Sequence, residues 1–259
     1  MTIHAPEAWR QSSIARFDQC PLSLKFDLEL DMRQVPGQMG QLGARGVLFH
    51  RFAAAAINHM RAHGESKIWV DIAMELLTEI IAQRDVEDDE VVLLPLSELR
   101  WLRVLVTKWG YRHEFSIERV VAVERRLNAD IEVIGPDGKR YLRTITGKPD
   151  LLLAGPADDE ATLVDWKSGF AGPPQRRPTE EHPDPEDKLS DMGYVQQTVY
   201  GWLVMRTYPA IERVTEREYY VMAKEDPVRE ASVCRWEMER IEDVLAAVVS
   251  QMDAAIEST

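Results

Sequence analysis

The sequence predicts an α/β protein in which a mixed central sheet is flanked by helices and preceded by a helical N-terminal region. Residues 1–115 carry apolar side chains mainly at helical spacing, whereas residues 116–259 contain alternating segments typical of strands and a C-terminal helix. A Gly-Pro-Asp-Gly segment at 135–138 separates two such strands, which is a hairpin signal. We therefore expect one domain spanning residues 1–259.

Size, charge and cysteine content exclude several classes of protein. The chain has 259 residues, of which 45% are hydrophobic, enough for a sizeable core. Its net charge of −13 argues against a protein that coats nucleic acid by charge alone, but allows an enzyme with a local basic groove. Its two cysteines form no metal or disulfide pattern. No segment resembles a membrane span or a signal peptide, so we expect a cytoplasmic protein without a membrane partner.

The N-terminal part begins with a short helix and a loop. Ser12 and Ser13 can cap a helix that has Ile14 and Phe17 among its apolar positions. Residues 34–43 contain one proline and three glycines, which predicts a loop.

Three further segments of this part have helical character. The spacing predicts a helix over 44–61, with four consecutive alanines at its centre, and a helical continuation over 68–81. Residues 85–90 are almost all acidic, which predicts a loop that faces solvent. A calcium site is the weaker alternative, because the segment lacks EF-hand spacing. A helix over 97–109 follows, with Ser97 as its N-cap.

Strands dominate the next part of the chain. Residues 117–127 alternate as a strand, and segments 131–134 and 140–145 flank the hairpin turn. Two more strands, 151–153 and 162–165, follow across a turn rich in Gly, Pro and Asp.

The last part returns to helices and adds two strands. Residues 170–187 are rich in Pro, Arg and Glu and predict a long loop of the kind that often forms a lid. A helix is expected over 189–205, strands over 217–222 and 233–236, and an amphipathic helix over 241–256.

Two carboxylates and a lysine are the clearest chemical signal. Asp165 and Lys167 end one predicted strand, and Asp150 starts the preceding one. Side chains alternate along a strand, so Asp165 and Lys167 point one way and Trp166 the other. If the strands are neighbours, the two carboxylates converge and repel unless a cation such as Mg²⁺ or Mn²⁺ separates them. This arrangement suits metal-assisted phosphodiester cleavage. The alternative is a surface ion pair, which the apolar strand disfavours.

Two other residues are candidates with simpler alternatives. His50 lies near the start of a predicted helix, one turn after Gly46, where a metal can approach closely. A helical histidine is more often an ordinary surface or core residue. Glu124 lies within the strand expected over 117–127, and its simplest interpretation is an edge-strand glutamate paired with Arg125 or Arg126.

Residues that could contact nucleic acid lie further along the chain. Gln196 and Tyr200 are four residues apart, so they share one face of a predicted helix, as they would on any amphipathic helix. Arg176 and Arg177 in the long loop are plausible phosphate contacts, although basic residues are common in solvated loops. The indole rings of Trp166 and Trp202 fit core positions better than base-stacking platforms.

Taken in order, these residues resemble a known family. His50, Glu124, Gly147–Asp150, Asp165–Gly169 and Gln196-x-x-x-Tyr200 are similar to the ordered motifs of the RecB-like exonucleases of the PD-(D/E)XK nuclease superfamily. The segment from Ser12 to Pro21 also resembles the first helix of that family. Phage-borne and CRISPR-associated exonucleases of this group are similar in size. The resemblance implies a PD-(D/E)XK nuclease-like sheet flanked by helices.

The resemblance also implies roles for the matching residues. Metal would be bound by His50, Asp150, Asp165 and the backbone carbonyl of Trp166. Lys167 would position or help to deprotonate the attacking water and offset charge at the scissile phosphate. Glu124 matches an acidic motif that supports the metal or the lysine. Together, Lys167, Asp165, Asp150 and Glu124 would form the catalytic set, and Gln196, Tyr200, Arg176 and Arg177 would contact DNA.

One feature departs from the family pattern. Many relatives bind a four-iron cluster through four cysteines, but this chain has only Cys20 and Cys234. Two thiols cannot hold such a cluster, so no iron–sulfur centre is expected.

The expected function is therefore a Mg²⁺- or Mn²⁺-dependent exonuclease acting on DNA ends or single strands, in recombination, repair or phage DNA processing. Two alternatives stay open: a catalytically inactive module for DNA binding or assembly, and a restriction-type endonuclease. A protein partner or a homo-oligomer could supply affinity for DNA. The resemblance places the protein in the cytoplasm of a bacterial or phage-infected cell.

Overall fold

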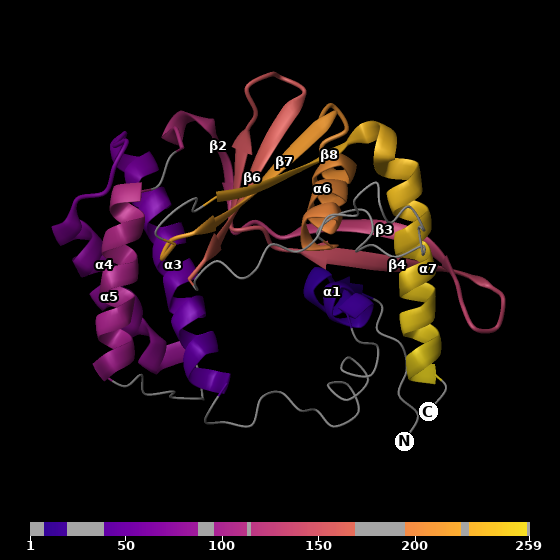
Figure 1. The fold of residues 1–259 in the computed structure, drawn as a ribbon, viewed down its shortest axis with the longest axis horizontal. Coiled ribbons are helices and arrows are strands. Elements are labelled where there is room, and N and C mark those ends of the chain that lie inside the picture. The colour runs from indigo at the N-terminus through magenta and orange to yellow at the C-terminus, as the bar shows by residue number, and fades with distance from the viewer. Residues whose placement is uncertain are drawn as a thin grey trace.

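The protein is described by a computed structural model that covers residues 8–19, 39–87, 96–112, 115–168, 195–223 and 228–257. The mixed α/β class expected from the sequence is confirmed, with helices flanking the strands (Figure 1). The predicted acidic loop over 85–90 was wrong in its first half, because residues 85–87 are helical. Residues 88–90, all of the predicted lid loop with Arg176 and Arg177, and Cys20 lie outside the described residues. In the described part of the chain, no helix is long and apolar enough to cross a membrane.

The helices between residues 39 and 112 form a layer on one side of the molecule (Figure 1). It consists of α3 (Met39–His63), α4 (Val70–Glu87) and α5 (Leu96–Arg112). The predicted loop over 34–43 was wrong in its last part, because α3 already begins at Met39 and includes Gly40 and Gly43. Each glycine costs a helix about 1 kcal/mol, and extending an established helix by many hydrogen-bonded residues offsets that cost.

Five strands form the sheet that faces this helical layer. In spatial order they are β2 (Val120–Val123), β5 (Leu151–Ala154), β6 (Glu160–Lys167), β7 (Arg213–Tyr220) and β8 (Val228–Cys234). The β6–β7 pair is parallel, and the other pairs are antiparallel. This sheet is the mixed sheet that the fold class requires, and β6 is its central strand.

A second sheet holds the predicted hairpin. Its strands are ordered β1 (Ala8–Arg10), β4 (Arg140–Gly147) and β3 (Leu127–Ile134), with β1 parallel to β4. The predicted single strand over 117–127 was wrong. A short 3₁₀ helix (Ile117–Arg119) precedes β2, and the chain then bends at Glu124, whose φ is +46°, before it enters β3 in the other sheet.

Three helices cover the opposite side from α3. They are α1 (Gln11–Gln19), α6 (Val195–Thr207) and α7 (Met238–Glu257), the last preceded by a 3₁₀ turn (Arg235–Glu237). Helix α1 begins before the serines expected to cap it, directly after β1. Asp253 of α7 is fully buried and joins β1 to β4: it accepts a hydrogen bond from Trp9 Nε1 at 3.0 Å and pairs with Arg143 Nε at 2.8 Å.

Strand β6 divides the interior into two hydrophobic cores. Leu163 belongs to the core under α6 and α7, whereas Val164 and Trp166 belong to the core under α3 and α5. Because both faces of β6 are buried, its register is fixed by packing, and the polar residues at its end have defined positions.

The contact between α6 and the end of β4 is close. A Cβ atom at Gly147 would lie 2.5 Å from Tyr200 Cε1 and 2.8 Å from Leu203 Cδ1. Only glycine allows the tyrosine ring to pack directly on this backbone.

We expect Gly147→Ala to destabilise the protein by about 1–3 kcal/mol, because the added methyl overlaps α6 side chains. The free energy of unfolding from urea titration measures this. Gly46→Ala is the matched control: its nearest atom, Ser168 Oγ, would lie 3.9 Å away, and alanine is favoured in a helix interior. Wild-type stability of Gly147→Ala would contradict the packing argument.

A candidate metal and catalytic site at the end of strand β6

Asp150 is fixed by the pairing of β5 with β6. Leu151 is paired with Val164, so Asp150 lies across from Asp165 at the open end of the two strands. The backbone N–H of Trp166 donates a hydrogen bond to Asp150 Oδ2 at 2.7 Å. The predicted convergence of the two aspartates therefore follows from antiparallel register, and one oxygen of Asp150 is held by the neighbouring strand.

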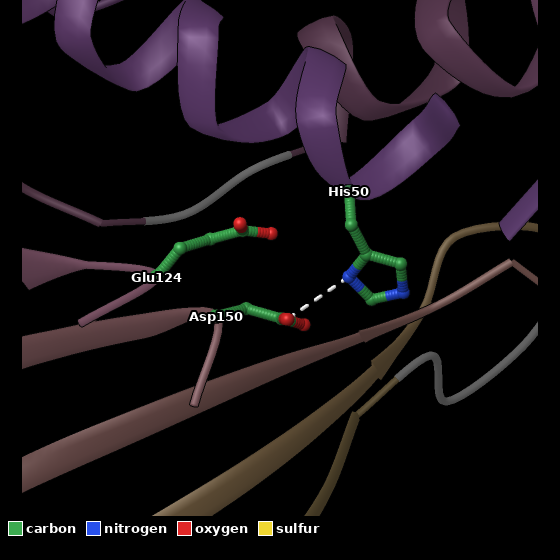
Figure 2. Close-up of side chains that lie close together, drawn as sticks. All are labelled: His50, Glu124 and Asp150. Carbon is green, nitrogen blue, oxygen red and sulfur yellow. Dashed lines mark ion pairs between the residues drawn. The ribbon is translucent and has the colours of Figure 1, made fainter. Parts of the chain in front are cut away.

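His50 reaches the same place from helix α3. Its Nδ1 lies 2.9 Å from Asp150 Oδ1, the contact drawn in Figure 2. Burial lowers the pKa of His50, but the hydrogen bond and charge of Asp150, followed by the charges of Asp165 and Glu124, outweigh burial and raise it above 6.5. His50 therefore contacts a site carboxylate, and its role as a metal ligand stays a prediction.

Glu124 is brought in by the bend between the two sheets. Its left-handed backbone is held by a hydrogen bond from its N–H to the carbonyl of Asp150 at 2.9 Å. The side chain extends towards His50 and Asp150 (Figure 2), and its Oε2 accepts a hydrogen bond from Lys148 Nζ at 2.7 Å. The cationic partner of Glu124 is therefore Lys148, where the sequence suggested Arg125 or Arg126.

These three side chains form a candidate metal site. One ligand atom from each of His50, Glu124 and Asp150 lies within 4.8 Å of the others. Two carboxylates and an imidazole suit a divalent cation, and the cation would relieve the repulsion between the carboxylates. Asp165, which was predicted to be a metal ligand, is not in this group of three.

Asp165 is buried and paired with Lys167. It is 8% exposed, and its Oδ2 forms an ion pair with Lys167 Nζ, so a surface ion pair is ruled out. Burial raises the pKa of Asp165 to about 6; Lys167 opposes this shift, and Asp150 adds to it. The charged form of Asp165 is thus stabilised by its ion pair with Lys167.

Lys167 lies among several acceptors. Its Nζ donates to Gln196 Oε1 at 3.4 Å and lies 3.6 Å from Glu218 Oε1. Burial lowers the pKa of Lys167, but the charge and hydrogen bond of Asp165, and then Glu218, outweigh burial and raise it above its usual value. The lysine is therefore a cation at neutral pH.

Strand β7 adds two glutamates that sequence reasoning missed. Glu216 and Glu218 are 2% and 9% exposed, and β7 was predicted to start only after Glu216, at Arg217. No described residue forms a hydrogen bond with either buried oxygen of Glu216. Burial, followed by the charge of Asp165, raises the pKa of Glu216 well above its usual value. The alternation of acidic residues along this strand was the available signal.

Gln196 and Tyr200 lie on the site side of α6. Tyr200 is 7% exposed, and its hydroxyl donates to the carbonyl of Lys148 at 3.3 Å, so it braces the turn that leads to Asp150. Their proposed contacts with DNA stay predictions, as does metal binding by the Trp166 carbonyl. The core positions expected for Trp166 and Trp202 are confirmed, because both indoles are buried.

Comparisons with known proteins identify the family. No curated protein matches the chain in sequence. The crystal structure of SSO0001 is 12% identical, with a TM-score of 0.37, over 96% of this chain and 78% of its own. A crystal structure described as a candidate exonuclease from Eubacterium rectale is 10% identical, with a TM-score of 0.44, over 97% and 82%. A sequence model described as the PD-(D/E)XK nuclease superfamily matches residues 8–258. Since this match covers almost the whole chain, the protein belongs to the PD-(D/E)XK nuclease superfamily.

Proposed function

We propose that the protein is a divalent-metal-dependent DNA exonuclease of the RecB-like group in this superfamily. The observation that carries the proposal is the cluster of His50, Glu124 and Asp150 within 4.8 Å, next to the ion pair of buried Asp165 with partly exposed Lys167. Specificity for DNA ends or single strands, and a role in recombination, repair or phage DNA processing, are parts of the proposal that the ordered motifs support by resemblance.

The donor set fits Mg²⁺ or Mn²⁺. His50, Asp150 and Asp165 would hold the metal together with the Trp166 carbonyl, and Glu124 offers a further carboxylate. Asp150 Oδ2 is fixed by the Trp166 amide, so Asp150 Oδ1, which now faces His50, is the oxygen available to a cation. When bound, the cation would supply Lewis-acid stabilisation of charge at the scissile phosphate.

Lys167 would act as a donor of hydrogen bonds and positive charge. Burial lowers its pKa, but Asp165 outweighs burial and keeps the pKa above the usual value, so the side chain is an ammonium at neutral pH. An ammonium cannot accept a proton from water, but it can orient a water molecule or a phosphate oxygen through its N–H groups. We therefore assign positioning and charge stabilisation to Lys167, rather than general-base chemistry.

We expect Asp165→Ala and Lys167→Ala each to lower cleavage by at least roughly 100-fold, because each removes a charge from the reacting centre. Digestion of end-labelled single- and double-stranded DNA with Mg²⁺ or Mn²⁺ measures this. Circular dichroism checks that both variants fold. Asp158→Ala and Lys139→Ala are matched controls, since both residues are exposed in turns away from the site, and both variants should cleave like wild type.

The substrate form separates the proposal from its alternatives. Progressive shortening of linear DNA, with closed circular DNA left intact, is the expected result. Discrete bands and cleavage of circles would favour a restriction-type endonuclease, and binding without turnover in both metals would favour a non-catalytic module. Undiminished cleavage by Lys167→Ala would overturn the assigned site.

Metal affinity should increase with pH. The pKa of Asp165 is raised to about 6, chiefly by burial. For His50, burial acts in the opposite direction, but Asp150 outweighs it and raises the pKa above 6.5. Protons on these groups must leave before metal binds, so Mn²⁺ should bind roughly tenfold or more tightly at about pH 7.5 than at about pH 5.5. Isothermal titration calorimetry measures the affinities, and equal values would count against these ligands.

A further inference from the structure

A row of polar contacts leads from the edge of the five-stranded sheet to Lys167. Arg229 Nη1 of β8 donates to the Tyr220 hydroxyl at 3.3 Å, and its guanidinium lies over the Tyr220 ring, 4.9 Å from the centroid. The Tyr220 hydroxyl donates to Glu218 Oε2 at 2.9 Å. The other oxygen of Glu218, Oε1, lies 3.6 Å from Lys167 Nζ. Glu218 is therefore held at one oxygen and faces the lysine with the other.

Strand register explains why Glu218 faces the site. In the parallel β6–β7 pair, Asp165 is matched with Glu218, and Lys167 with Tyr220. Side chains of matched residues lie on the same face of a sheet, so these four side chains form one patch. In it, the two carboxylates lie side by side, and the lysine lies beside the tyrosine. The position of Glu218 is thus set by the backbone of the same strands that set Asp165.

Oxygen atoms of three side chains lie close to the Lys167 ammonium. The ammonium contacts Asp165, Glu218 and Gln196. Asp165 is also a proposed metal ligand, and an oxygen that binds a cation is a weaker partner for an ammonium. When Asp165 binds a metal, Glu218 is then the carboxylate among these three side chains that still balances the charge of the lysine.

We propose that Glu218, held by the Tyr220 hydroxyl, is a positioning residue that fixes the Lys167 ammonium beside the reacting phosphate. This inference rests on the proposed nuclease function and adds a residue to it. A side chain in a catalytic site must be held closely, because a misplacement of about 1 Å can cost roughly 100-fold in rate. Glu218 acts through Lys167 and does not itself contact the substrate.

The first test is steady-state cleavage by Glu218→Gln, which keeps the shape of the side chain but removes its charge. We expect kcat to fall roughly 10- to 100-fold with KM changed by no more than about twofold, because substrate binding is retained while the lysine is misplaced. Glu218→Asp restores the charge one methylene short and should recover part of the loss. Tyr220→Phe should lower kcat less, in the same direction.

Glu230→Gln is the matched control. Glu230 lies on the next strand and pairs with Arg217, which alternates to the other face of β7, so its loss should leave kcat unchanged. If Glu218→Gln and Tyr220→Phe both cleave with the kcat of wild type, the positioning role is wrong while the nuclease function stands. If Glu218→Gln does not fold, Tyr220→Phe alone decides the outcome.

A second readout does not depend on activity. Lysine residues labelled with ¹³C at Cε give NMR signals, and the signal lost in Lys167→Met identifies Lys167. In metal-free protein, Glu218→Gln should shift that signal, and Glu230→Gln should leave it in place. An unshifted Lys167 signal in Glu218→Gln would overturn the inference, whether or not the wild-type protein cleaves DNA. Absence of wild-type cleavage with a shifted signal would instead count against the proposed function alone.

Discussion

The hydrogen bond from the Trp166 amide to Asp150 Oδ2 is the interaction on which the site depends. It uses a backbone donor at the end of β6 to hold the carboxylate that precedes β5. The pairing of these two strands therefore sets the geometry of the site. The second oxygen of Asp150 meets His50, and the carbonyl of Asp150 receives the N–H of Glu124. One residue thereby joins a helix, a bend and two strands, and displacement of Asp150 would separate all of these partners.

The site also shows how a chain with a net charge of −13 concentrates acid in its interior. Asp165, Glu216 and Glu218 are all buried close to one lysine. Buried carboxylates are costly unless they are paired, protonated or bound to a cation. Lys167 pairs with Asp165 and Glu218, and burial raises the pKa of Glu216 well above its usual value. The excess of negative charge around Asp150 is what makes a divalent cation a favourable addition.

Sequence reasoning found the parts of the site that strand alternation determines, and missed those that depend on tertiary structure. The meeting of Asp150 with Asp165 follows from two short strands and a turn. The bend at Glu124 contains no glycine or proline that would predict it. Its positive φ is held by the hydrogen bond from its N–H to the Asp150 carbonyl, which sequence cannot foresee. Glu216 lay outside the predicted strand, and Glu218 lay inside it but was overlooked because its proposed role depends on a parallel neighbour more than fifty residues away. Gly40 and Gly43 suggested a loop, but a long helix includes them.

The position of His50 on α3 has a consequence for how the proposed metal site is assembled. The sheet alone brings Asp150, Asp165 and Lys167 together. The imidazole of His50 reaches Asp150 through the packing of the helical layer on the core around Trp166. The two hydrophobic cores lie on opposite faces of β6, so the sheet can be covered on one face before the other. A chain with only one face covered would hold the carboxylates without their nitrogen donor. In the proposed metal site, packing of the helical layer would therefore complete the set of ligands.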